Sequence, residues 1–177
     1  MSERSLIDQC SPTLAGIKTA SLFSSICETE DLRRINRLLS SKGLVAIPLK
    51  KNKCSTLIYV FRPMLLKRAL REEDTRNFLI GCGYEPDDIR LCIRHLIERL
   101  KETDFPHEIG VFLGYPLEDV KGFIENRGQN YKLLGMWKVY GDPKESAMLF
   151  EKYRNCTRSY MRAYENGNTI EQLTVAV

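Results

Sequence analysis

Cys10 and His107 are the two residues of this chain whose types and expected positions best fit a chemical role. Cys10 directly precedes Ser11-Pro12, a pair typical of an N-cap followed by the first turn of a helix. The unpaired N–H groups and the dipole of a helix start favour an anion, so this position would lower the pKa of the thiol. His107 lies at the expected entrance of an apolar strand, where its imidazole could serve as a base.

A cysteine at a helix start and a later histidine at a strand start form the arrangement of papain-like thiol enzymes, in the same chain order. On this hypothesis Cys10 is the nucleophile, His107 is the base, and Asp142 or Glu108 orients the imidazole. On a strand, however, the adjacent side chains of His107 and Glu108 would point to opposite faces. The cysteine motifs of known thiol proteases are absent. The alternative is that Cys10 is a small buried residue beside a helix cap.

The stretch Phe105–Asp119 supplies the element that would position His107. Its apolar run Ile109–Leu113, between a proline and a glycine, predicts a buried strand. Gly114 allows a sharp turn because it lacks a Cβ, and Pro116 suits the first turn of a following helix. A strand, a glycine turn and a helix start are half of a βα unit.

The remaining periodicity and turn signals predict a chain of alternating helices and short strands. Helices are expected over about 11–26, 29–42, 64–70, 74–80, 86–100, 117–126 and 143–165, and strands over 44–49, 55–61, 109–113 and part of 131–140. The link between the first two strands has hairpin length, and the last two strands would form a parallel β-α-β unit. The predicted fold class is therefore α+β (or α/β): a single globular domain over residues 1–177, with a small mixed sheet of about four strands covered by helices.

The composition is typical of a soluble globular protein, with 43% hydrophobic and 28% charged residues among 177. The net charge of +4 permits an anionic partner without requiring one. No apolar run approaches the length of a membrane span, and the N-terminal residues lack a signal-peptide pattern, so we expect a cytoplasmic protein. Its six cysteines show no disulfide rhythm and are expected to be free thiols. With two histidines and no C-x-x-C pair, no metal site is expected.

Two further surfaces are candidates for binding. A pocket is expected where the ends of the 109–113 and 133–140 strands meet the helix start at Cys10, and its predicted ligand-binding residues are Lys18, Tyr115, Trp137 and Tyr140. Core packing is the commoner role of such a tryptophan, and ordinary connections are the commoner role of the turns beside these strands. Arg154, Arg158 and Arg162 recur every four residues on one expected helix and could meet phosphate or an acidic partner. Their alternative is a solvated helix face, so nucleic acid is not the preferred partner.

Four blocks of the chain resemble a family of small proteins from anaerobic Gram-positive bacteria, catalogued as domain of unknown function thirty-seven ninety-three. The blocks are CSPTLAGIK at 10–18, FPHEIGVFLGYPLED at 105–119, WKVYGD at 137–142 and YRNCT at 153–157. The resemblance covers nearly the whole chain. It implies a cytoplasmic bacterial protein and supplies no activity.

Three functions therefore remain open. The first is a module that binds an unknown small molecule or protein in the expected pocket. The second is the thiol enzyme with Cys10 and His107. The third is docking of RNA or an acidic protein on the arginine ridge. No cofactor, substrate or oligomeric state is indicated by the sequence.

Overall fold

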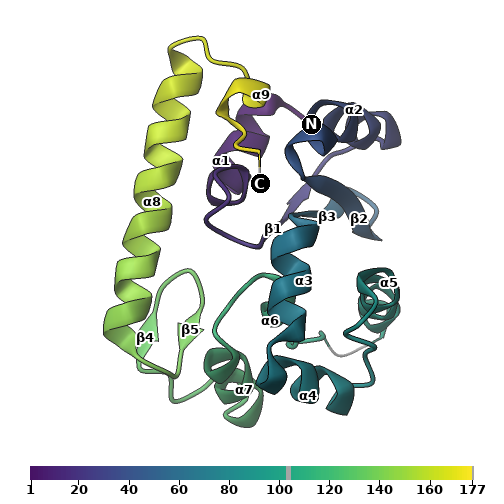
Figure 1. The fold of residues 1–177 in the computed structure, drawn as a ribbon, viewed down its shortest axis with the longest axis vertical. Helices are drawn as coiled ribbons and strands as arrows, with labels where there is room; N and C mark the ends of the chain where they lie inside the picture. Colours follow the sequence, from purple (N-terminus) through teal and green to yellow (C-terminus); the bar gives the residue numbers. More distant parts are fainter. Residues whose placement is uncertain (103–104, 177) are drawn as a thin grey trace.

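The computed structural model describes residues 1–102 and 105–176, which form a helix-rich structure with two small sheets (Figure 1). The helices are α1 (Glu3–Leu14), α2 (Thr29–Leu39), the 3-10 turn η1 (Ser40–Lys42), α3 (Pro63–Arg71), α4 (Glu73–Gly81), α5 (Ile89–Arg99), α6 (Ile109–Phe112), α7 (Leu117–Glu125), α8 (Pro143–Glu165) and α9 (Ile170–Leu173). The strands are β1 (Ala20–Ser25), β2 (Val45–Lys51), β3 (Thr56–Phe61), β4 (Leu133–Leu134) and β5 (Lys138–Val139).

The central strand β3 organises the larger sheet. The sheet is antiparallel, with the order β1-β3-β2. The sequence of β3, TLIYVF, is apolar on both faces because both faces are covered. Ile58 and Val60 pack on one side, and Tyr59 and Phe61 pack on the other. The edge strand β2 carries Pro48 at a break in register, where a missing N–H costs no ladder hydrogen bond.

Helices cover both faces of this sheet. On one face, α1, α2 and α9 enclose a core built from Leu6, Ile7, Cys10, Leu14, Leu32, Ile35, Leu39 and Ile170. On the other face, the segment from α3 to α7 encloses a second core that includes Leu66, Leu70, Leu79, Leu96, Ile109, Phe112 and Val120. Figure 1 shows α1, α2 and α9 together at one end of the molecule and α4 and α7 at the other.

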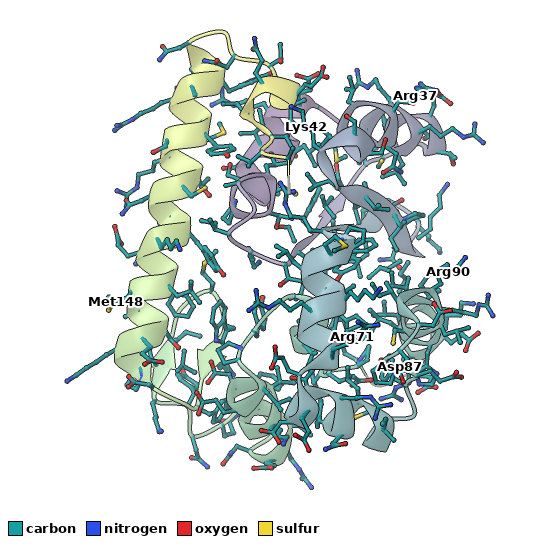
Figure 2. All side chains as sticks on the ribbon, viewed as in Figure 1. Arg37, Lys42, Arg71, Asp87, Arg90 and Met148 are labelled. Atoms are coloured by element: carbon teal, nitrogen blue, oxygen red, sulfur yellow. The ribbon has the colours of Figure 1, made fainter. Side chains whose placement is uncertain are left out.

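The long helix α8 runs beside α1 along one flank of the molecule (Figure 1). Near its N-terminus, Phe150 and Tyr153 pack with Trp137 and Val139 of the β4–β5 hairpin in a third, small core. Its opposite side is open to solvent, where Met148 projects outward (Figure 2). The hairpin is therefore held between α8 and the segment that contains α6 and α7.

The α+β class is confirmed: small sheets, including the β2–β3 hairpin, are packed with helices. Helices with clear start signals also lie where they were predicted. Asp88 caps α5 by accepting hydrogen bonds from the backbone N–H groups of Arg90 and Leu91. Pro143 opens α8, which ends at Glu165 before Gly167, whose φ of +94° is in the left-handed region.

The helix predicted over residues 11–26 is wrong in place and extent. Helix α1 begins at Glu3, with Ser2 as its N-cap, and contains Pro12 in its interior. It ends before Gly16, which has a φ of +74°. The residues after it form β1, which pairs with β3. Local spacing favoured a helix, but the exposed edge of β3 offered a row of backbone partners that a local reading does not include.

The strand predicted over residues 109–113 is also wrong, because this run forms α6 and the turns around it. Short apolar runs do not distinguish a buried strand from a buried helix. Here Gly110 lets α6 approach α7 closely, since a Cβ on it would lie 2.7 Å from Cγ2 of Val120. The predicted turn at Gly114 is present, with a φ of +76°.

No late parallel β-α-β unit occurs among the residues that the structure describes. The segment 131–140 does contain strand, but as the two-residue strands β4 and β5, which pair with each other in antiparallel fashion. With residues 109–113 helical, β5 has no parallel neighbour there. Gly135 sits in the tight connection of this hairpin because a Cβ would collide with the ring of Phe150. The larger sheet accordingly has three antiparallel strands instead of a mixed four.

None of the helices within residues 1–102 and 105–176 has both the length and the apolar character needed to cross a membrane.

Candidate functional site

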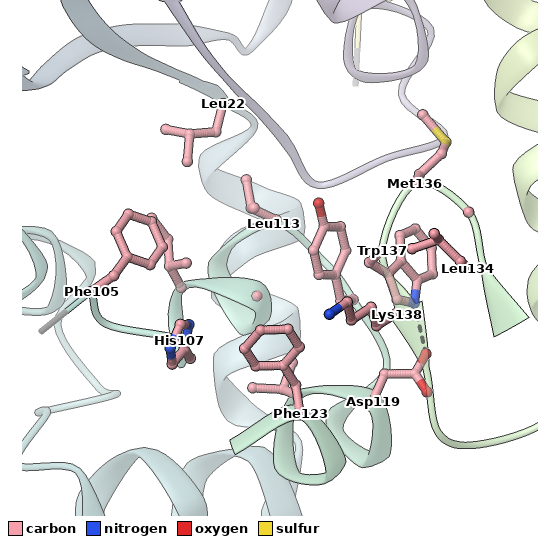
Figure 3. Close-up of a pocket in the computed structure, with 15 residues that line it drawn as sticks. Leu22, Phe105, His107, Leu113, Asp119, Phe123, Leu134, Met136, Trp137 and Lys138 are labelled. Carbon is pink, nitrogen blue, oxygen red and sulfur yellow. Dashed lines mark hydrogen bonds between the residues drawn. The ribbon is translucent and has the colours of Figure 1, made fainter. Parts of the chain in front are cut away.

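A cavity of about 340 Å³ lies between α6, α7, the β4–β5 hairpin and strand β1. Its lining is mainly apolar and aromatic: Leu22, Phe105, His107, Ile109, Gly110, Leu113, Tyr115, Asp119, Val120, Phe123, Leu134, Gly135, Met136, Trp137 and Lys138 (Figure 3). This volume lies within the range of small-molecule sites, and the lining has their usual composition of apolar walls with a few polar groups.

The rim of the cavity exposes large apolar side chains to solvent. Phe105 is 51% exposed, Leu134 is 61% exposed and Met136 is 47% exposed. Inside the rim, Tyr115 and Trp137 stack with their ring centroids 4.4 Å apart. Clustered exposed apolar residues around a hollow are typical of a binding site rather than of ordinary surface.

Asp119 fixes the geometry of the wall that carries Trp137. One carboxylate oxygen accepts a hydrogen bond from Nε1 of Trp137 at 2.7 Å (Figure 3). The other accepts from the backbone N–H groups of Tyr140 at 2.7 Å and Gly141 at 2.8 Å. Asp119 lies in the first turn of α7, where a negative charge also suits the helix dipole. One buried carboxylate therefore joins α7 to the end of the hairpin.

The four residues predicted to bind a ligand are only partly brought together. Tyr115 and Trp137 line the cavity. Lys18 lies behind this wall, with Nζ 5.7 Å from the Tyr115 ring centroid and 5.9 Å from that of Tyr153. Burial lowers the pKa of Lys18 to about 8. Tyr140 packs on Gly122, and its hydroxyl donates to the carbonyl of Gln129, so it supports the hairpin from outside the cavity.

The prediction that Cys10 begins a helix is wrong, and the proposed activation of its thiol fails with it. Cys10 lies inside α1 and is fully buried in the core on the α1 face of the sheet. Burial raises the pKa of the Cys10 thiol to about 12. His107 lies elsewhere, with its ring against Phe105 and Phe123. The geometry therefore buries the Cys10 thiol, whose raised pKa favours the protonated form, and places His107 in a different part of the molecule.

Thiol labelling checks this assignment. In the folded protein we expect iodoacetamide to modify the exposed Cys54 first and to leave Cys10 unmodified, because only the thiolate of an accessible cysteine reacts readily. Peptide mass spectrometry over a time course measures both rates. In urea the two should react at similar rates, which serves as the control. Labelling of Cys10 as fast as Cys54 in the folded state would restore the thiol-enzyme hypothesis.

The two groups proposed to orient His107 have structural partners instead. Glu108 is buried, and one of its oxygens accepts hydrogen bonds from Tyr84 at 3.0 Å and from Nε of Arg99 at 3.1 Å. Asp142 is the N-cap of α8 and accepts from two backbone N–H groups. Among the hydrogen bonds of residues 1–102 and 105–176, none involves the side chain of His107, which is exposed at the cavity.

The arginine ridge on α8 is partly neutralised. Glu151 forms ion pairs with Arg154 at 3.0 Å and with Arg158 at 4.0 Å. Exposed pairs of this kind contribute little stability but reduce the net charge of the ridge. Within the described part of the chain, no cluster of three or more His, Cys, Asp or Glu side chains could hold a metal ion.

The cavity residues that the sequence did not mark as binding residues include Asp119, Phe123 and Lys138. Local patterns mark Asp119 only as an acid in the first turn of a helix, and Phe123 only as an apolar position of that helix. The sequence signal for these residues is the short distance along the chain between the helix that begins at Leu117 and the WKVYGD block. A hairpin so close to the end of a helix packs on that helix. The contact between the hairpin and α7 depends on a tight turn at Gly135, which the residue pattern does not predict.

The fold and the cavity define an α+β protein with an aromatic-lined cavity between two short helices and a hairpin. The chain belongs to the family described as Protein of unknown function (DUF3793), whose model matches residues 6–174. No curated protein and no solved structure matches the chain. The resemblance expected from the four sequence blocks is thereby confirmed.

Proposed function

We propose that this protein is a small-molecule binding module whose site is the cavity between α6, α7 and the β4–β5 hairpin. The observation that carries the proposal is the cavity itself: about 340 Å³, walled by stacked Tyr115 and Trp137 and rimmed by exposed apolar side chains. Exposed apolar side chains around a cavity lower the solubility of a protein, and they are typical of sites that bind a ligand. We further propose a bacterial, cytoplasmic setting, supported by six cysteines that form no disulfide in the described residues.

The cavity favours a flat, apolar ligand. Tyr115 and Trp137 present a stacked aromatic surface, and Leu113 and Val120 add aliphatic walls. Aromatic side chains prefer offset stacking or edge contacts with other rings, so a planar ligand would gain both buried area and ring contacts. The thiol enzyme and the arginine ridge have no comparable supporting geometry, because Cys10 is buried and Glu151 pairs with two of the three arginines.

The first test uses the neutral fluorescent probe N-phenyl-1-naphthylamine. We expect saturable binding with one site per chain, and energy transfer from Trp137, which is the only tryptophan and lies in the cavity wall. Leu22→Trp places a larger side chain in the cavity and should weaken the probe roughly tenfold or more, a loss of about 1.4 kcal/mol. In the variants the probe is excited directly, so the added tryptophan does not interfere.

The matched control is Leu173→Trp, a half-buried leucine on α9, which packs in the core on the other face of the sheet. It should bind the probe like the wild type. If the wild type does not bind the probe, or if Leu22→Trp binds it as well as Leu173→Trp does, the cavity is not the ligand site.

A further inference from the structure

The polar groups of the cavity differ in what they leave available to a ligand. The ionisable side chains that line it, apart from Tyr115, are His107, Asp119 and Lys138. Asp119 is buried, and its two oxygens already accept three N–H donors. The Asp119 carboxylate therefore already binds the donors of the cavity wall, and a cationic ligand would have to compete with those three hydrogen bonds.

Lys138 brings a positive charge that no carboxylate within residues 1–102 and 105–176 pairs with by an ion pair. Its ammonium donates one hydrogen bond to the carbonyl of Gly128 at 2.7 Å. It also lies 5.6 Å from the ring centroid of Phe123 and 5.0 Å from that of Tyr131. An ammonium has three donors, so two remain for a ligand.

His107 also contacts Phe123, the phenylalanine whose ring lies near the Lys138 ammonium. Its ring centroid is 4.7 Å from that of Phe123 and 5.8 Å from that of Phe105. Figure 3 shows His107, Phe123 and Lys138 along one side of the cavity. Neither imidazole nitrogen takes part in a hydrogen bond in the described part of the chain, so a ring N–H is available as a donor.

Within residues 1–102 and 105–176, the groups left available are thus donors: an ammonium without an ion pair and an imidazole face the cavity, and the carboxylate of Asp119 already accepts three hydrogen bonds. We infer that the ligand is an amphipathic organic anion, with a planar apolar body against Tyr115 and Trp137 and a carboxylate or similar group held by Lys138 and His107. The inference rests on the proposed function and adds the charge of the ligand to it. Charge complementarity of this kind selects among ligands of similar shape.

Two naphthalene probes of nearly the same shape test the charge. N-phenyl-1-naphthylamine is neutral, and 1-anilinonaphthalene-8-sulfonate is the same ring system with a sulfonate. In the wild type we expect added salt to weaken the sulfonate and leave the neutral probe unchanged. In Lys138→Met the sulfonate should bind roughly tenfold more weakly, while the neutral probe binds as before. Lys138→Arg, which keeps the charge, should restore most of the lost affinity.

The matched control is Lys132→Met. Lys132 is in the same hairpin region and also donates to a backbone carbonyl, that of Gly141 at 2.9 Å, but it does not line the cavity. Lys132→Met removes the same charge from the protein as Lys138→Met and should leave the affinities for the neutral probe and the sulfonate unchanged. His107→Leu should weaken the sulfonate selectively, as Lys138→Met does.

The outcomes separate the two proposals. If the neutral probe binds and Leu22→Trp excludes it, but Lys138→Met and His107→Leu leave sulfonate binding unchanged, the anion inference fails and the cavity remains the ligand site. Equal losses in Lys132→Met and Lys138→Met would likewise overturn it, because a general charge effect would then explain them. If the neutral probe does not bind the wild type, the proposed function fails and the inference fails with it.

Discussion

Replacing Arg62 with methionine should lower the free energy of unfolding by about 4 kcal/mol, a large part of the stability of an ordinary domain. Arg62 is 1% exposed and follows directly after β3. Its guanidinium donates to four backbone carbonyls, those of Thr13, Leu14, Lys42 and Val175, at 2.6 to 3.0 Å. Methionine fills a similar volume but donates nothing, so Lys42 and Val175 would lose the donor to their carbonyls, and Thr13 and Leu14 would keep only the backbone N–H groups of Gly16 and Val175. Urea unfolding followed by circular dichroism measures the loss.

The size of this effect follows from what Arg62 joins. Two of its acceptors end α1, one lies in η1, and one lies in the C-terminal segment after α9. Such carbonyls at helix ends lack intrahelical partners and need another donor. Burial lowers the pKa of Arg62 from its ordinary value, but a guanidinium remains charged in proteins. Its forked donors reach several segments at once, which no other side chain does as well.

Two further variants make the prediction specific. Arg68→Met, on the exposed side of α3, should change the free energy of unfolding by less than about 0.5 kcal/mol. Arg62→Lys keeps the charge but not the fork, and should cost at least half as much as Arg62→Met. It also remains measurable if Arg62→Met fails to fold. A loss below about 1 kcal/mol in Arg62→Met would show that the four carbonyls find other partners.

Replacing Asp119 with alanine should cost about 3 kcal/mol of stability and abolish probe binding in the cavity. The carboxylate is 2% exposed and satisfies three N–H donors, of Trp137, Tyr140 and Gly141. Without it, the three hydrogen bonds that join α7 to the hairpin end are lost, and the indole loses its partner. The emission of Trp137 should shift to the red because the ring becomes more exposed to water. Urea unfolding and fluorescence together measure both effects.

Asp142→Ala is the matched control for this carboxylate. Asp142 also accepts two backbone N–H hydrogen bonds, but at an exposed N-cap, so its loss should cost only about 1 kcal/mol and leave the Trp137 emission unchanged. Asp119→Asn keeps the shape and part of the acceptor capacity, and should fall between the wild type and Asp119→Ala. If Asp119→Ala and Asp142→Ala lower the free energy of unfolding equally, Asp119 does not have the proposed role of joining α7 to the hairpin.

The sequence by itself determined the elements whose signals are local. Helix α5 follows its cap at Asp88, helix α8 follows Asp142-Pro143, and the β2–β3 hairpin follows from two apolar runs with a polar link. Their boundaries depend on caps, turns and periodicity within a few residues, so the residue pattern contains the information. The α+β class also followed from these patterns. The expected pocket included residues of the 109–140 region that line the cavity, but it was placed at Cys10, which lies in the core on the other face of the sheet.

Only the tertiary structure decided the rest. Residues 20–25 form a strand because their backbone pairs with the edge of β3. Residues 109–112 form a helix that packs closely on α7, which Gly110 allows because it has no Cβ. The same applies to single residues. Cys10 became a buried core thiol because α1 begins nine residues earlier than the Ser11-Pro12 signal indicated. Asp119 came to hold the cavity wall because the β4–β5 hairpin folds onto it. Each outcome depends on contacts between segments far apart in the chain, which local residue patterns do not encode.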